Sequence, residues 1–247
     1  MLIVLVGVWL GIIGPMPDGV ANWLQKWQTL AGAGVATIAA YIAFQNTSRS
    51  MAHAERLERN RRERKHAAVR AVLPLALSQV IAYAEKSAQS LNRLSELCGR
   101  GGTLPFGTAL AMIVEPLPVE TLKTLTDFIE YTDGELGVLE STVAWIQIHD
   151  ARVRSIVESN NDPSLTRIVV QLELENSIID AASIYAGAAA FFNYARRREA
   201  NWPRSLSWDG VFGALRNMRF WDEQTSLYAN VERRERGSSG PFDTLAR

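Results

Sequence analysis

The 22 residues from Trp27 to Ser48 read WQTLAGAGVATIAAYIAFQNTS and contain no charged side chain. A helix of about 20 apolar residues is long enough to cross the hydrocarbon core of a bilayer. Trp23 and Trp27 lie one helical turn apart at the start of this stretch, with Lys26 between them. Tryptophan and lysine are typical of the membrane–water interface, so the stretch predicts a transmembrane helix. A buried hairpin in a soluble core is the alternative.

A second apolar stretch comes before it. Residues 2–14 read LIVLVGVWLGIIG, which is short for a span, although bilayer thinning or packing on a longer neighbour can accommodate a short span. No basic residue precedes the stretch and no clear cleavage site follows it, which argues against a signal peptide. We therefore expect residues 1–48 to form a membrane anchor, either one transmembrane helix or a helical hairpin.

Small residues recur at four-residue spacing in both apolar stretches. They are Gly7 and Gly11 in the first stretch, and Gly32, Ala36 and Ala40 in the second. Such faces let helix backbones approach closely in lipid, where packing drives helix association. The spacing predicts that these five residues lie at helix-packing surfaces.

Residues 49–73 carry eight basic and three acidic side chains, beginning with Arg49 and Arg56, which we expect at the membrane interface. The positive-inside rule places residues 49–247 in the cytoplasm. Few large apolar residues interrupt the segment, so it predicts an exposed helical stalk whose first turns can lie against anionic headgroups. No aromatic residue interleaves the arginines, and this argues against a nucleic-acid partner.

The pattern changes at Leu73, where apolar residues begin to alternate in steps of four and three. This heptad seam predicts a coiled-coil-like helix that packs either inside the cytoplasmic domain or against a second copy of the chain. Pro74 is expected to kink or restart the helix. The seam comprises Leu73, Leu77, Val80, Ala84, Ser87, Leu91, Leu94 and Cys98.

The remaining sequence predicts helices joined by short connections, so we expect an all-α fold with a cytoplasmic helical domain at 74–236 and a flexible tail at 237–247. The uncharged run at 181–195, AASIYAGAAAFFNYA, is short for a membrane span and predicts a core helix. Aromatic and basic residues between 191 and 221 are typical of a core with a capped helix, or of a surface returning to the membrane. The expected helices are 118–131, 136–158, 163–198, 207–218 and 220–236.

No pattern of residues indicates catalysis, a cofactor or a metal ion. The chain has 26 basic and 26 acidic side chains, and its lone Cys98 excludes a disulfide scaffold. His149 and Asp150 are adjacent on a predicted helix, where a capped or solvated polar pair is favoured over a base with an orienting carboxylate. HExxH, CxxC and P-loop motifs are lacking, so we expect no catalytic, cofactor-binding or metal-binding residue.

The run WLQKWQTLAGAGVATIAAYIAF, followed by ERLERNRRERKHAAVRAVLPLALS, resembles a pattern in uncharacterised bacterial membrane-anchored proteins. The resemblance spans about residues 23–80 and implies a bacterial inner-membrane location without implying an activity. We expect a non-enzymatic scaffold, interaction or signal-relay protein that contacts the lipid bilayer and an unidentified protein partner. The alternative is a subunit of a membrane transport or envelope assembly.

Overall fold

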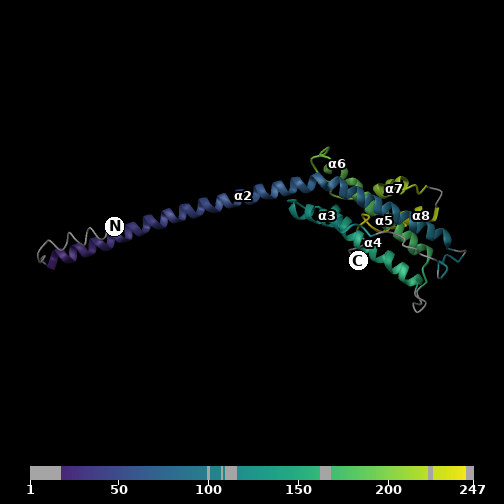
Figure 1. The fold of residues 1–247 in the computed structure, drawn as a ribbon, viewed down its shortest axis with the longest axis horizontal. Helices are drawn as coiled ribbons and strands as arrows, with labels where there is room; N and C mark the ends of the chain where they lie inside the picture. Colours follow the sequence, from purple (N-terminus) through teal and green to yellow (C-terminus); the bar gives the residue numbers. More distant parts are fainter. Residues whose placement is uncertain are drawn as a thin grey trace. The chain divides into compact units, whose positions relative to one another are not determined.

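The computed structural model describes residues 18–98, 101–106, 108, 116–161, 168–221 and 225–242. The all-α prediction is confirmed, because these ranges fold into helices and contain no β-strand (Figure 1). The helices are α2 (Asp18–Leu97), α3 (Val119–Tyr131), α4 (Gly137–Asn161), α5 (Gln171–Ala190), α6 (Phe192–Ala195), α7 (Trp208–Asn217) and α8 (Thr225–Gly237).

The chain divides into two compact units, Met1–Arg61 and Arg62–Arg247. In the first unit, every side chain from Ala31 to Arg61 is exposed except Gln45, which is partly buried and donates to the Tyr41 hydroxyl at 2.7 Å. We call the second unit the head. It begins inside the predicted stalk, so residues 62–73 belong to the head.

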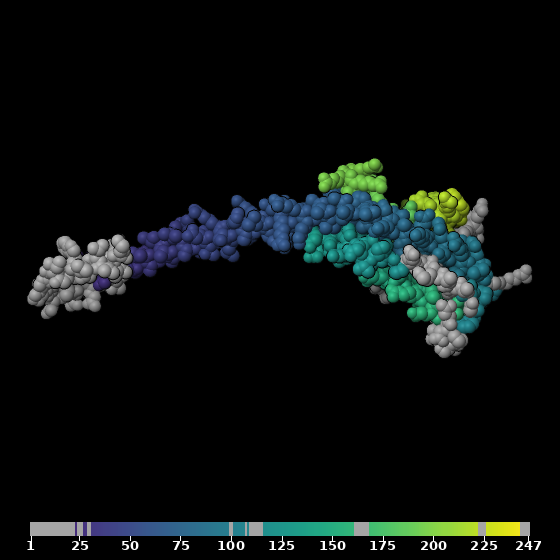
Figure 2. Space-filling view, viewed as in Figure 1, coloured from purple at the N-terminus to yellow at the C-terminus, as the bar shows by residue number. Residues whose placement is uncertain are grey.

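The heptad seam lies in the core of the head. Leu73, Leu77 and Leu91 have no exposed surface, and the seam positions between them are equally buried. They pack on α3, α4 and α5, and Figure 2 shows α2 lying along the surface formed by α3 and α4. The seam is therefore covered by other helices of the same chain. In Figure 1, α3 and α4 lie on one side of this part of α2, with α6 and α7 on the other.

Helix α2 does not restart at Pro74, which lies inside it. Proline has no N–H group, so the carbonyl of Arg70 four residues earlier receives no bond from it. The flanking seam residues, Leu73 and Leu77, are fully buried in the core. We attribute the continuity of the helix to this burial on both sides of the proline.

Helix α5 occupies the centre of the head and packs against α4, α7 and α8. Residues 181–188 are buried apart from Tyr185, so the predicted core helix is confirmed as far as Ala190, where α5 ends; the end of the predicted run forms the separate helix α6. The helix is shorter than predicted. At its start, residues 168–170 are extended and Val170 forms an antiparallel bridge with Thr103. The predicted start of this helix at residue 163 lies outside the described residues.

The C-terminal segment that the sequence assigns to a tail contacts the core. Pro241 is buried, and the Phe242 ring lies 6.1 Å from the Trp145 ring of α4. Gly187 of α5 makes this close packing possible, because a Cβ there would come within 3.2 Å of Phe242 and 2.3 Å of Thr142. The segment up to Phe242 therefore covers the contact between α4 and α5.

Candidate functional sites

The predicted membrane-interface residues lie on α2, and their described side chains face outward. Trp23 and Trp27 are exposed with ring centroids 5.7 Å apart, and Arg49 and Arg56 are exposed further along the helix. The side chain of Lys26 lies outside the described residues. The stretch 2–14, with Gly7 and Gly11, also lies outside them.

The apolar part of α2 has two different faces. At about 100° per residue, its five large apolar side chains share one half of the helix circumference. Gly32, Ala36 and Ala40 share the other half, and all three are exposed. No atom lies within 4 Å of the position that a Cβ on Gly32 would take. The large residues, each more than half exposed, are Val35, Ile38, Tyr41, Ile42 and Phe44.

Within the described residues, α2 is the one helix that is long and apolar enough to cross a membrane, judged by length and composition. Signal sequences and core helices of soluble proteins meet the same criterion. The two apolar stretches of α2 differ in how far their side chains are buried. The stretch around the seam is buried in the head, whereas residues 31–44 are exposed throughout.

A buried polar pair links α2 to α4. Ser87 and His149 have no exposed surface and share a hydrogen bond of 2.6 Å between Oγ and Nε2. Burial lowers the pKa of His149 to about 4, so the imidazole is neutral at pH 7. Its Nδ1 atom is buried and has no hydrogen-bond partner among the described residues, and the Tyr83 ring packs edge-on at 6.1 Å. The interpretation of His149 as solvated is wrong.

The neighbouring Asp150 does not orient His149. It is partly exposed and forms an ion pair with Arg154 on the same helix. The buried face of α4 passes through Thr142 and Trp145 to His149. A serine beside a neutral histidine has the composition of a nucleophile and its base. Because both are fully buried, no substrate atom can reach them, and we assign the pair a structural role.

Asp180 is a second buried polar centre and joins three helices. It is 1% exposed on α5, and it forms ion pairs with Arg152 of α4 and with Arg234 of α8, the latter at 2.8 Å. Arg234 also donates to the backbone carbonyl of Asn176 at 3.3 Å. The partners lie 28 and 54 residues from Asp180. This separation left no local signal in the sequence.

The described residues form neither a metal site nor an activated thiol. No three His, Cys, Asp or Glu side chains converge there. Cys98 is partly buried and its Sγ lies 3.6 Å from the carbonyl of Leu94. Burial raises the pKa of this thiol, and the thiol form is a poor nucleophile.

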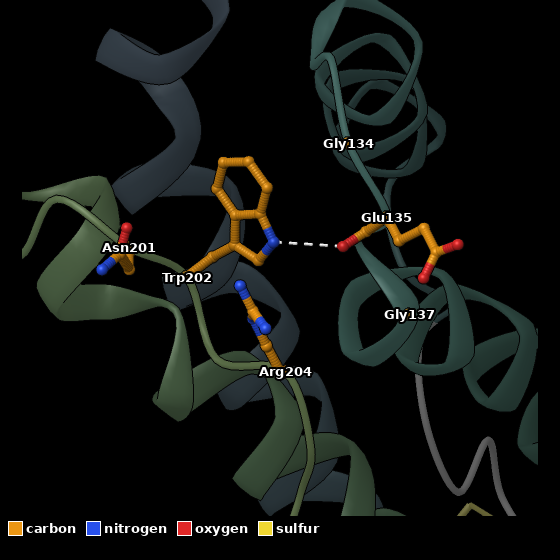
Figure 3. Close-up of a pocket in the computed structure, with 6 residues that line it drawn as sticks. All are labelled: Gly134, Glu135, Gly137, Asn201, Trp202 and Arg204. Carbon is orange, nitrogen blue, oxygen red and sulfur yellow. Dashed lines mark hydrogen bonds between the residues drawn. The ribbon is translucent and has the colours of Figure 1, made fainter.

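A hollow of about 740 Å³ lies between the α3–α4 loop and the α6–α7 loop (Figure 3). The indole N–H of Trp202 donates to the backbone carbonyl of Glu135 at 3.1 Å and ties the loops together. Gly134 has φ +144°, and a Cβ on it would lie 2.9 Å from the Trp202 ring. The sequence placed Trp202 in the aromatic and basic cluster between 191 and 221 and did not indicate this bond between the two loops. The lining residues are Gly134, Glu135, Gly137, Asn201, Trp202 and Arg204.

A row of aromatic contacts connects this hollow to α2. Trp202 packs edge-on against Tyr194 at 5.5 Å, Tyr194 lies 6.1 Å from Phe128, and Phe128 lies 5.3 Å from His66 of α2. The Arg70 guanidinium stacks 3.8 Å from the Tyr194 ring and donates to its carbonyl at 2.6 Å. Burial lowers the pKa of His66. His66 thus lies where α2 meets α3, in contact with the Phe128 ring.

Comparisons with protein-family models, curated proteins and solved structures found no match.

Proposed function

We propose that this chain is a membrane-anchored, non-enzymatic helical protein that binds a partner or relays a state through α2. The observation that carries the proposal is the uncharged segment 27–48 of α2, in which the large apolar side chains from Val35 to Phe44 are exposed. Burying one such side chain contributes about 1.5–3 kcal/mol, so several exposed on one helix strongly favour an apolar environment. A bilayer supplies that environment along the full length of the segment.

The charges beside the segment support an orientation. Residues 49–73 hold eight basic and three acidic side chains, whereas residues 15–26 hold only Asp18 and Lys26. The excess of arginine favours a cytoplasmic head. The resemblance of residues 23–80 to bacterial membrane-anchored proteins supports placing the anchor in the inner membrane of a bacterium. Arg49 and Arg56 are exposed and would meet anionic headgroups.

The relay part of the proposal rests on how α2 enters the head. His66 contacts Phe128, the Lys65 ammonium lies 3.2 Å from the hydroxyl of Tyr131, and Arg70 binds the carbonyl of Tyr194. These contacts join α2 to α3 and α6. A rotation or shift of α2 would therefore change the packing of both helices.

One observation favours the alternative, a subunit of a transport or envelope assembly. The face that carries Gly32, Ala36 and Ala40 is exposed and narrow, and it is suited to close contact with another transmembrane helix. In this alternative the partner lies inside the membrane. In the main proposal the partner, an unidentified protein, meets the head.

Membrane extraction tests the anchor. Ile38→Asp combined with Ile42→Asp places two charges in the middle of the segment, where each costs about 2.5–3.5 kcal/mol in a spanning helix. We expect wild-type protein to resist alkaline carbonate extraction and the double variant to become soluble. The matched control is Met51→Asp with Leu57→Asp, two exposed sites beyond the segment, which should stay in the membrane. Extraction of the wild type would refute the anchor.

A further inference from the structure

The hollow beside Trp202 presents free hydrogen-bond donors. The side chains of Arg204 and Asn201 line it, and neither has a partner among the described residues. Arg204 and Trp202 line the hollow from the same loop, two residues apart, whereas Glu135 lines it from the opposite loop and its carboxylate points away from Trp202 in Figure 3. The lining contributed by residues 201–204 therefore carries one positive charge.

We propose that this hollow binds an organic anion, whose carboxylate or phosphate pairs with Arg204 and whose apolar body lies against Trp202. A guanidinium presents a planar fork of N–H donors that matches the two oxygens of either group. The Asn201 amide supplies a further donor. The volume of about 740 Å³ lies within the range of small-molecule sites, about 300–1,000 Å³.

The indole is held in place before any ligand arrives. Its N–H bonds to the carbonyl of Glu135, and its ring packs against Tyr194 and faces Gly134, where there is no room for a Cβ. A side chain fixed from three directions loses little conformational entropy on binding. The rigid wall is thus Trp202, and the adjustable group is the exposed Arg204.

The position of Tyr194 connects the site to α2, and this part of the inference rests on the proposed relay function. Tyr194 contacts Trp202 on one side, and Arg70 of α2 binds both its ring and its carbonyl. An anion that pulls Arg204 and shifts the Trp202 ring would change this contact. Binding of an anion in the hollow would therefore alter how strongly the backbone amides of α2 around residues 62–70 are protected from hydrogen exchange.

Fluorine NMR of the full-length chain in detergent micelles tests binding. The protein carries 5-fluorotryptophan, and Trp202→Phe assigns the resonance. Benzoate and phenyl phosphate are the probes, and benzamide is the uncharged control. We expect a saturable shift of the Trp202 signal with at least one anion and none with benzamide. Comparing the two anions identifies the preferred head group.

Arg204→Gln removes the charge, and we expect it to weaken anion binding about tenfold or more. Arg198→Gln, at an exposed arginine outside the hollow, is the matched control and should leave binding unchanged. No saturable shift with either anion, or equal binding by Arg204→Gln, would overturn the site. Hydrogen exchange at residues 62–70, with and without the tighter anion, tests the coupling, and unchanged exchange would overturn that part alone. Both readouts are independent of the carbonate extraction, so failure of the anchor is seen separately.

Discussion

The closest approach between α4 and α5 provides a quantitative test of the packing in the head. Gly187→Ala would place a Cβ 2.3 Å from Thr142 Oγ1 and 3.2 Å from Phe242 Cζ. Gly213→Ala, in α7, would place one where no atom lies within 4 Å. The same substitution therefore adds a methyl group to a crowded site at Gly187 and to an open site at Gly213.

The expected magnitudes follow from two opposing effects. Alanine stabilises a helix by about 1 kcal/mol relative to glycine, while overpacking a core costs about 1–3 kcal/mol. Because the contact with Thr142 falls far inside van der Waals distance, we take the upper end for Gly187→Ala, a net loss of about 2 kcal/mol. For a unit of this size the melting temperature should fall by about 4–8 °C. Gly213→Ala should raise it by about 2–4 °C.

Thermal unfolding of the full-length chain in a mild detergent, followed by tryptophan fluorescence, measures both variants. Trp145 and Trp208 are buried in the head and report on its core. Adding Thr142→Ala to Gly187→Ala removes the clashing oxygen and should restore most of the loss. If Gly187→Ala is as stable as Gly213→Ala, or if Thr142→Ala gives no rescue, the described crossing of α4 and α5 is incorrect.

Three further predictions concern the core and the tail. Burial lowers the pKa of His149 from 6.5 to about 4, so its contribution to stability is fully present above about pH 6.5 and is lost as the pH falls toward 4, by up to about 3 kcal/mol. Urea unfolding at pH 7.5 and at pH 4.5 measures how much unfolding free energy is lost on acidification. We expect this loss to be smaller in His149→Gln than in the wild type, and an equal loss in the two proteins would contradict the assignment. Phe242→Ala should lower the free energy of unfolding by about 1–2 kcal/mol. It should also shift the fluorescence emission of Trp145 to the red, because the half-buried Phe242 ring covers that indole. Unchanged emission would show that the segment ending at Phe242 does not pack on Trp145. Leu91→Cys in Cys98→Ser protein should form no cross-linked dimer in membranes, since position 91 is fully buried in one chain, and a disulfide dimer would show that the seam opens to a second copy.

Local patterns predicted the elements that local physics determines. The heptad spacing identified the buried positions of α2 from Leu73 to Leu94, because burial of one helix face repeats every three to four residues. The sequence predicted a helix at 207–218, and at the start of α7 the Ser207 Oγ accepts a bond from the Gly210 N–H at 3.3 Å. Both features depend on neighbours within a few turns.

Features that depend on distant residues were not predicted. The burial of His149 depends on Ser87, 62 residues away. The hollow depends on a bond between Trp202 and Glu135, 67 residues apart. The start of α5 is displaced because the backbone at Val170 pairs with Thr103 instead of continuing a helix. Periodicity within one helix carries no information about such partners.

The central claim is that residues 27–48 lie in a bilayer, and cysteine accessibility tests it most directly. Ile38 and Leu57 are exposed to a similar extent, 62% and 56%, in the chain itself. A Cys98→Ser protein with Ile38→Cys or Leu57→Cys would therefore label equally with a maleimide if both sites were in water. In native membranes opened to the reagent, we predict labelling at 57 and protection at 38, with the protection lost in denaturant. Equal labelling at the two sites in native membranes would contradict the account.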